Sequence, residues 1–275
     1  LARHGKDKKV RRVVSIGSPF EGAVDAIEKV STGMGTLTGS FPRDREREAS
    51  RTIPALYQLL PSYDGAVKGE PGQPDDVFEV HTWEVWQRSV LQTLREYIRL
   101  HKAEITPEKL LGQYLDAAWK LRLRIRALDL TKVLPEGAKG WLAIVGLGAP
   151  TRITVEAKKE AGGRWFWFPP PVDEWSDDHN SVKTGDATVP FHGAIPRFLR
   201  VENLVCVSPD EFGMMELQDK LLAKTAGFHA ALPTVNLVQR LVIKFLRREY
   251  SGDIEARPAP GVARPDWPMD IPVKT

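Results

Sequence analysis

Residues 9–18 read Lys9-Val-Arg-Arg-Val-Val-Ser-Ile-Gly-Ser18, a basic lead-in to a β-branched run that ends at a glycine. Pro19 closes the turn that follows, and apolar residues then recur at helical spacing at Ala23, Ala26, Ile27 and Val30. The pattern predicts a buried strand, a tight turn and a helix. Because a strand followed by a helix is half of a βαβ unit, this stretch predicts a parallel sheet with helices packed on it.

The second half of the chain returns to the same alternation. Residues 140–146 (Gly-Trp-Leu-Ala-Ile-Val-Gly) and 203–208 (Asn-Leu-Val-Cys-Val-Ser) predict two further buried strands. Residues 152–156 and 164–168 flank a Gly-Gly pair, which is typical of a hairpin. A last helix is predicted from about 234 to 248. The fold class is therefore predicted to be α/β.

The middle of the chain differs in composition and in its apolar pattern. Residues 31–51 are rich in Gly, Ser, Thr and charge, so we expect a mobile loop there. Two antiparallel helices are predicted between about 78 and 131, and the second begins at Thr106-Pro107. Its predicted apolar stripe is Tyr114, Ala118, Leu121, Ile125 and Leu128, and its predicted polar face carries Lys120, Arg122, Arg124 and Arg126.

These elements suggest four segments. We expect the first part of an α/β core at 1–66, a helical cap insertion at 67–138, the second part of the core at 139–250, and a Pro-rich tail at 251–275. Aromatic residues gather in the expected cap, at Trp83, Trp86, Tyr97, Tyr114 and Trp119. They are compatible with a lid over an apolar pocket and equally with a helix-on-helix core.

Composition excludes several classes of function. The 39 basic and 36 acidic residues nearly balance, which argues against a nucleic-acid-binding protein. Cys206 has no partner for a disulfide within the chain and is interpreted as core filler. The chain begins at Leu1 without Met or a signal pattern, so we expect a fragment. The location stays open, although one cysteine and no visible signal favour the cytoplasm.

Asp186 and His229 are the candidate catalytic residues. Asp186 stands in the turn Thr184-Gly-Asp-Ala-Thr-Val-Pro190, and His229 follows Gly227-Phe228 just before the last helix. In open α/β sheets reactive groups gather at the carboxyl ends of the strands, and an Asp that holds a His in one tautomer is two-thirds of a hydrolase triad. A simple β-turn at Asp186 and a polar loop residue at His229 are the alternatives.

Other histidines are weaker candidates. His192 competes with His229 for the role of base, but it would have to come from the acid loop itself. Asp177-Asp178-His179 looks like a solvated loop rather than a metal site, because adjacent residues rarely all face one ion. His81 and His101 are expected at the surface.

The nucleophile is the missing part. No Gly-x-Ser-x-Gly elbow occurs in the sequence. Ser18 comes nearest, but it lacks the second glycine, and Pro19 removes a backbone N–H that an oxyanion hole would use. No P-loop and no Gly-x-Gly-x-x-Gly helix start is present, so no cofactor is expected.

Taken in order, several motifs resemble the lecithin:cholesterol acyltransferase-like (LCAT-like) branch of the α/β-hydrolases. They are Leu1-Ala-Arg3, Val14-Ser-Ile-Gly-Ser-Pro-Phe-Glu-Gly22, Tyr57-Gln-Leu-Leu-Pro-Ser62, Val145-Gly-Leu-Gly-Ala-Pro-Thr151, Gly185-Asp-Ala-Thr-Val-Pro190 and Gly227-Phe-His229. The resemblance is weakest over the helical insert and absent in the tail.

The resemblance implies an α/β-hydrolase fold, Asp186 as the triad acid and His229 as the base. It implies acyl transfer through an acyl-serine, with water or an alcohol as acceptor and a lipid or other ester as substrate. The serine elbow of the family would precede residue 1, so the fragment alone is expected to be inactive. Residues 120–126 are a candidate surface for peripheral membrane contact. The alternative is a non-catalytic α/β scaffold or partner-binding protein.

Overall fold

A computed structural model describes residues 10–33, 43–69, 71–160, 163–174, 178–212, 227–249 and 254–274. The chain divides into two compact units. Unit 1 comprises residues 1–20, 125–151 and 171–275, and unit 2 comprises residues 21–124 and 152–170. Unit 2 therefore takes in residues from before the expected cap, and also the hairpin that follows it.

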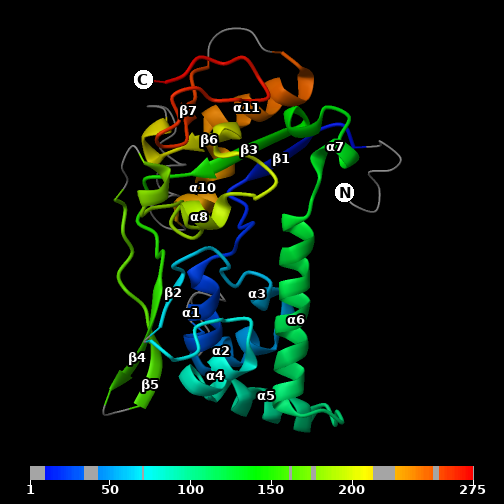
Figure 1. Cartoon of the computed structure of the whole chain (residues 1–275), viewed down its shortest axis with the longest axis vertical. Coiled ribbons are helices and arrows are strands. Elements are labelled where there is room, and N and C mark those ends of the chain that lie inside the picture. Colours follow the sequence, from blue (N-terminus) through cyan, green and yellow to red (C-terminus); the bar gives the residue numbers. More distant parts are fainter. Residues whose placement is uncertain are drawn as a thin grey trace. The chain divides into compact units, whose positions relative to one another are not determined.

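Unit 1 is built on a four-stranded sheet in the order β1-β3-β6-β7 (Figure 1). These strands are β1 (Val13–Ile16), β3 (Trp141–Gly146), β6 (Leu204–Val207) and β7 (Arg257–Pro258). β3 lies parallel to β1 and to β6, with Ile16 opposite Ile144 and Ala143 opposite Leu204, whereas β7 is antiparallel to β6. β3 is buried at every position, as a central parallel strand should be. The structure is thus mixed α/β, and its sheet is mostly parallel.

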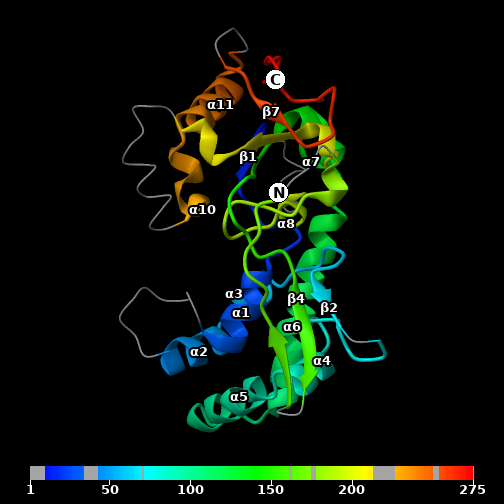
Figure 2. The same ribbon diagram turned by 90° about the vertical axis from the view of Figure 1, so that its left-hand side faces the viewer.

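Helices cover both faces of this sheet, α11 on one side and α7 on the other (Figure 2). On one face α10 (Phe228–Ala231) and α11 (Asn236–Arg247) pack their buried residues on alternate residues of β3 and β6. On the other face α7 (Leu130–Val133) and α8 (Phe191–Ala194) pack on the residues in between. This alternation follows from the two-residue period of a strand. The last helix is where the sequence predicted it.

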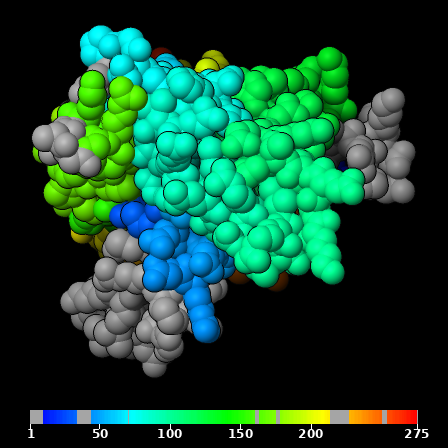
Figure 3. All heavy atoms as spheres, turned by 90° about the horizontal axis from the view of Figure 1, so that it is seen from below, coloured from blue at the N-terminus to red at the C-terminus, as the bar shows by residue number. Residues whose placement is uncertain are grey.

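Unit 2 is a helical assembly with a small sheet. Its helices are α1 (Val24–Thr32), α2 (Arg43–Thr52), α3 (Pro54–Tyr57), α4 (Val80–Trp86), α5 (Ser89–Leu100) and α6 (Pro107–Arg126). Its sheet has the order β2-β4-β5, where β2 is Val67–Lys68 and the predicted hairpin is β4 (Val155–Glu160) with β5 (Gly163–Trp167). In the space-filling view α4, α5 and α6 form one continuous packed face (Figure 3).

Two tryptophans of the expected cap, Trp83 and Trp86, lie in the core of unit 2. Trp83 and Trp86 are buried, and both rings contact Phe166 of the hairpin. Each indole N–H also donates to a backbone carbonyl, at Val77 and Pro74. Buried Trp side chains need such a partner. The core interpretation is therefore correct for Trp83 and Trp86.

Two sequence predictions in unit 2 are wrong. Part of the loop predicted at 31–51 is the helix α2, whose Arg51 is buried and donates to the carbonyls of Val30 and Ser31 and to the hydroxyl of Ser89. These bonds hold a segment that looks too polar to be ordered. Residues 34–42, the rest of that loop, lie outside the described residues.

The second error concerns the buried face of α6. Its buried positions are Leu111, Leu115, Ala118 and Arg122, so the stripe predicted at 114, 118, 121, 125 and 128 is rotated from the real one. Arg122 is buried because its guanidinium donates to the carbonyls of Gln58 and Leu60. It therefore cannot belong to the exposed basic face predicted for residues 120–126. The predicted cap at Thr106 is correct, since its hydroxyl accepts from the amide of Lys109.

The Pro-rich tail is part of unit 1 and packs on its other elements. Ala256 and Trp267 are buried, and the indole of Trp267 donates to the carbonyl of Leu204 at 2.7 Å. Lys139 and Arg200 both pair with Asp266. None of the helices in the described ranges is both long and apolar enough to cross a bilayer.

Candidate active site

The acid turn folds tightly onto itself after Gly185. A Cβ on Gly185 would lie 2.1 Å from the carbonyl oxygen of Val189, so only glycine fits before Asp186. Asp186 Oδ1 accepts from the amides of Thr188, at 3.1 Å, and Val189, at 2.7 Å. The carboxylate is 1% exposed. The chain thus fixes Asp186 by local hydrogen bonds and leaves its second oxygen for another partner.

Hydrogen bonds through Thr151 and Ala187 connect the acid turn to the loop after β3. Ala187 has a left-handed backbone with φ of 79°, which costs energy for any residue other than glycine. Its amide donates to Thr151 Oγ1, and that hydroxyl donates in turn to the carbonyl of Ala149. Thr184 Oγ1 donates to the same carbonyl. This strained turn is held by the loop that follows β3.

His229 is presented by the short helix α10. Gly227, with φ of 87°, turns the chain into the helix, and buried Phe228 anchors it against the ring of Phe212. His229 Nδ1 lies 2.7 Å from Asp186 Oδ2. The contact predicted from the sequence is therefore present. The His229 side chain is 37% exposed, so one edge of the ring remains accessible.

Two strand-end glycines make room for this pair, a role that was not predicted from the sequence. Gly17 follows β1, and a Cβ there would lie 2.9 Å from Asp186 Oδ2 and 3.3 Å from His229 Nδ1. Gly146 ends β3, and a Cβ there would lie 2.4 Å from the Cβ of Asp186. A glycine at the carboxyl end of each strand was the available signal. The acid and base therefore lie against the carboxyl ends of two adjacent parallel strands.

This arrangement has a defined chemical consequence. A carboxylate only accepts hydrogen bonds, so the proton between the two groups sits on Nδ1 when the imidazole is neutral. The other ring nitrogen, Nε2, then carries the lone pair and can accept a proton. An Asp that fixes a His in this tautomer prepares it to act as a general base.

The rival histidines are placed elsewhere. His192 lies in α8, where burial lowers the pKa of its imidazole and a hydrogen bond with the backbone of Val182 acts in the opposite direction. Asp178 caps a short turn, since its carboxylate accepts from the amide of Asn180 and the hydroxyl of Ser181. Asp177 lies outside the described residues. His81 and His101 are exposed, as predicted.

Two other kinds of site, a metal site and a reactive thiol, were compared with the described part of the chain. There, no three His, Cys, Asp or Glu side chains are grouped to hold a metal ion. Cys206 is fully buried in β6, and burial raises the pKa of its thiol to about 12. A thiol with that pKa is protonated at neutral pH and is a poor nucleophile. The core-filler interpretation of Cys206 is correct.

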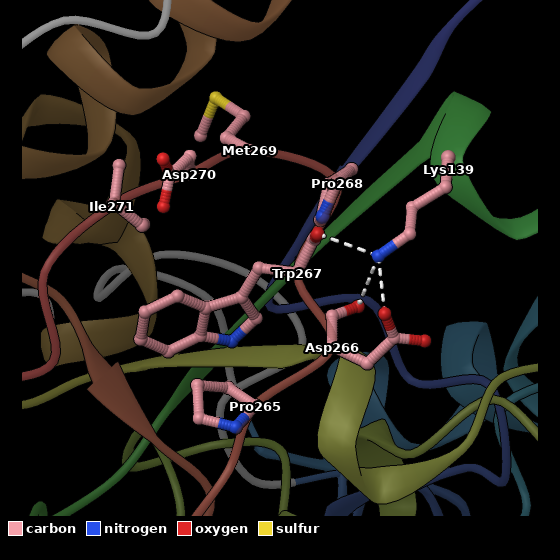
Figure 4. Close-up of a pocket in the computed structure, with 8 residues that line it drawn as sticks. All are labelled: Lys139, Pro265, Asp266, Trp267, Pro268, Met269, Asp270 and Ile271. Carbon is pink, nitrogen blue, oxygen red and sulfur yellow. Dashed lines mark hydrogen bonds and ion pairs between the residues drawn. The ribbon is translucent and has the colours of Figure 1, made fainter.

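A cavity of about 400 Å³ lies between the tail and Lys139 (Figure 4). Lys139 Nζ points at the tail, where it bonds to the Asp266 side chain and to the carbonyl of Trp267 at 2.9 Å. The positive charge is thus already matched by a carboxylate. The residues that line this cavity do not include Asp186 or His229.

No protein-family model and no curated protein sequence matches this chain.

Proposed function

We propose that Asp186 and His229 are the acid and base of a Ser-Asp-His triad in an LCAT-like α/β-hydrolase. The enzyme would transfer an acyl group from a lipid or other ester to water or to an alcohol. The observation that carries the proposal is the 2.7 Å contact between His229 Nδ1 and Asp186 Oδ2. The carboxylate is buried and the imidazole is partly exposed. In a triad the acid is held in place in this way while the base can reach the nucleophile.

The surroundings of the pair support the same proposal. The acid lies in the chain between β3 and β6, and the base lies between β6 and the last helix, which is the chain order of an α/β-hydrolase after its serine. The two groups lie by Gly17 and Gly146, at the carboxyl ends of parallel strands. Reactive groups of open α/β sheets gather there.

The proposal requires a serine that none of the motifs in these 275 residues supplies. In the proposed mechanism, His229 Nε2 takes the proton of the serine hydroxyl as the oxygen attacks the ester carbonyl. Asp186 stabilises the imidazolium, which then protonates the leaving alcohol. Water or a second alcohol repeats the sequence on the acyl-serine and releases the product.

The test expresses the protein together with the coding sequence upstream of Leu1. We expect covalent labelling by a fluorophosphonate and hydrolysis of p-nitrophenyl acyl esters. Asp186→Asn should lower kcat by about 10⁴, because the amide holds the wrong tautomer. His229→Gln should abolish labelling. His192→Gln is the matched control, and we expect it to keep the wild-type rate.

Two outcomes would remove the proposal. One is a protein whose upstream sequence encodes no Gly-x-Ser-x-Gly and which takes no label. The other is a labelled, active enzyme whose rate is unchanged by Asp186→Asn and His229→Gln. The first would favour a non-catalytic α/β scaffold. The second would place the acid and base on other residues.

A further inference from the structure

The backbone that follows the acid is held in a strained conformation by the side chain of Thr151. Ala187 has a φ of 79°, in the left-handed region that glycine adopts freely and other residues adopt at a cost. Its amide donates to Thr151 Oγ1 at 2.9 Å, and within the described ranges no second group accepts from it. A residue other than glycine keeps such a conformation where its surroundings impose it. The hydroxyl of Thr151 is one such constraint.

Thr151 is itself a rigid support. It is buried, and its amide and carbonyl both pair with the backbone of Val172, at 2.8 and 3.0 Å. Its hydroxyl donates to the carbonyl of Ala149 at 2.8 Å. Because a hydroxyl has one proton to donate, this bond turns the lone pairs of Oγ1 toward the amide of Ala187. The position and the orientation of the acceptor are therefore both fixed.

A second buried threonine, Thr184, shows which bond is specific to Thr151. The hydroxyl of Thr184 also donates to the carbonyl of Ala149, at 3.0 Å, and accepts from the amide of Gly148 at 3.1 Å. The carbonyl of Ala149 therefore keeps a donor when Thr151 is replaced, whereas the amide of Ala187 loses its acceptor. A Thr151→Val substitution thus removes a bond to the acid turn and leaves the loop after β3 its other contacts.

The amide that Thr151 holds belongs to the residue directly after Asp186. Further along the same turn, the amides of Thr188 and Val189 donate to Asp186 Oδ1. The conformation of the turn and the orientation of the carboxylate are therefore linked. The 2.7 Å contact between Asp186 Oδ2 and His229 Nδ1 depends on that orientation.

We propose that Thr151 is a positioning residue for the acid: its hydroxyl holds the strained turn that aims Asp186 at His229. Thr151 acts through Asp186 and does not contact the imidazole itself. The effect on the rate rests on the proposed acyl transfer, whereas the effect on the protonation of the imidazole ring does not.

The first experiment measures the tautomer of His229 in the 275-residue chain. The ¹⁵N shifts of the ring are assigned with His229→Gln and recorded at a pH at which the imidazole is neutral. We expect the wild type to hold its proton on Nδ1. Thr151→Val should spread the proton over both ring nitrogens, because the carboxylate no longer faces Nδ1. Thr151→Ser, which keeps the hydroxyl, should retain the wild-type tautomer.

Two further substitutions separate positioning from a general loss of stability. Thr82→Val is the matched control, because Thr82 is equally buried but its hydroxyl has no hydrogen-bond partner in the described part of the chain. It should leave the tautomer of His229 unchanged. Ala187→Gly removes the strain, since glycine adopts a left-handed backbone freely. Added to Thr151→Val, it should restore the wild-type tautomer at least in part, which a merely structural role of Thr151 would not produce.

The second experiment measures kinetics on the protein expressed with the coding sequence upstream of Leu1. Thr151→Val should lower kcat for p-nitrophenyl acyl esters by about ten- to a hundredfold, because a misplacement on the order of 1 Å costs up to about 10²-fold. KM should stay the same, since the substrate loses no contact. Thr151→Ser should keep the wild-type kcat.

The proposal is overturned if a folded Thr151→Val chain keeps the wild-type tautomer, or if Thr151→Ser loses it to the same extent as Thr151→Val. It is also overturned if Ala187→Gly brings no recovery to Thr151→Val. Should Thr151→Val alone fail to fold, the double variant decides: a folded chain with the wild-type tautomer supports the proposal, and an unfolded one overturns it. A protein that takes no fluorophosphonate label would remove the proposed function and leave the tautomer comparison intact.

Discussion

Replacing Gly146 by alanine should disrupt the acid and base pair although neither Asp186 nor His229 is itself replaced. The new Cβ would lie 2.4 Å from the Cβ of Asp186, a contact that neither the central strand β3 nor the hydrogen-bonded acid turn can relieve easily. The backbone of Gly146 is not left-handed, so the effect is steric rather than conformational. Overpacking of this kind costs about 1–3 kcal/mol.

The assay combines urea denaturation with NMR of the imidazole. We expect Gly146→Ala to lower the free energy of unfolding by about 1–3 kcal/mol and to weaken or abolish the downfield signal of the His229 Nδ1 proton. Gly112→Ala is the control. Its Cβ would meet only a side-chain atom of Val80 at 3.5 Å, so the helix α6 should gain about 0.5–1 kcal/mol. A Gly146→Ala variant with wild-type stability and an intact proton signal would refute the described packing of Asp186 on β3.

Three further predictions concern buried polar groups. Arg122→Met should destabilise the protein by about 1–3 kcal/mol for each carbonyl left without a donor, at Gln58 and Leu60, as measured by urea denaturation; wild-type stability would contradict these bonds. Cys206, whose pKa is raised by burial to about 12, should resist a thiol reagent until the protein unfolds, and rapid labelling of the native chain would show that β6 is not buried. Partial burial lowers the pKa of His192, so the unfolded state binds its proton first, and the free energy of unfolding should fall as the pH drops below about 6.5. His192→Gln should reduce that fall, and an unchanged pH profile would argue against a desolvated imidazole at His192.

The sequence was informative where local pattern and structure coincide. The β-branched run before Gly17, the apolar run of residues 140–146 and the run of 203–208 became the three parallel strands of unit 1. A buried parallel strand must be apolar on both faces, which leaves a visible signal. The Asp186–His229 pairing was also foreseeable, because both residues follow strands whose carboxyl ends share one edge of the sheet.

The sequence failed where a charged side chain is buried by distant carbonyls. Residues 31–51 were predicted as a loop from their Gly, Ser, Thr and charge content, which includes Arg51, and Arg122 was predicted on the polar face of α6. Their burial depends on backbone oxygens up to 64 positions away, at Val30, Ser31, Gln58 and Leu60. No local periodicity reveals such partners, because the acceptor is any residue's carbonyl.

The sequence by itself determined the alternating architecture of unit 1 and the two residues of the candidate acid and base pair. Only the tertiary structure decided that Gly17 and Gly146 leave the space in which that pair forms. It also decided that Thr151 accepts from the amide of Ala187 beside the acid. The physical reason is the same in both cases. Periodicity reports which face of an element is apolar, whereas a close approach or a hydrogen bond between two loops depends on segments that are far apart in the chain and adjacent only after folding.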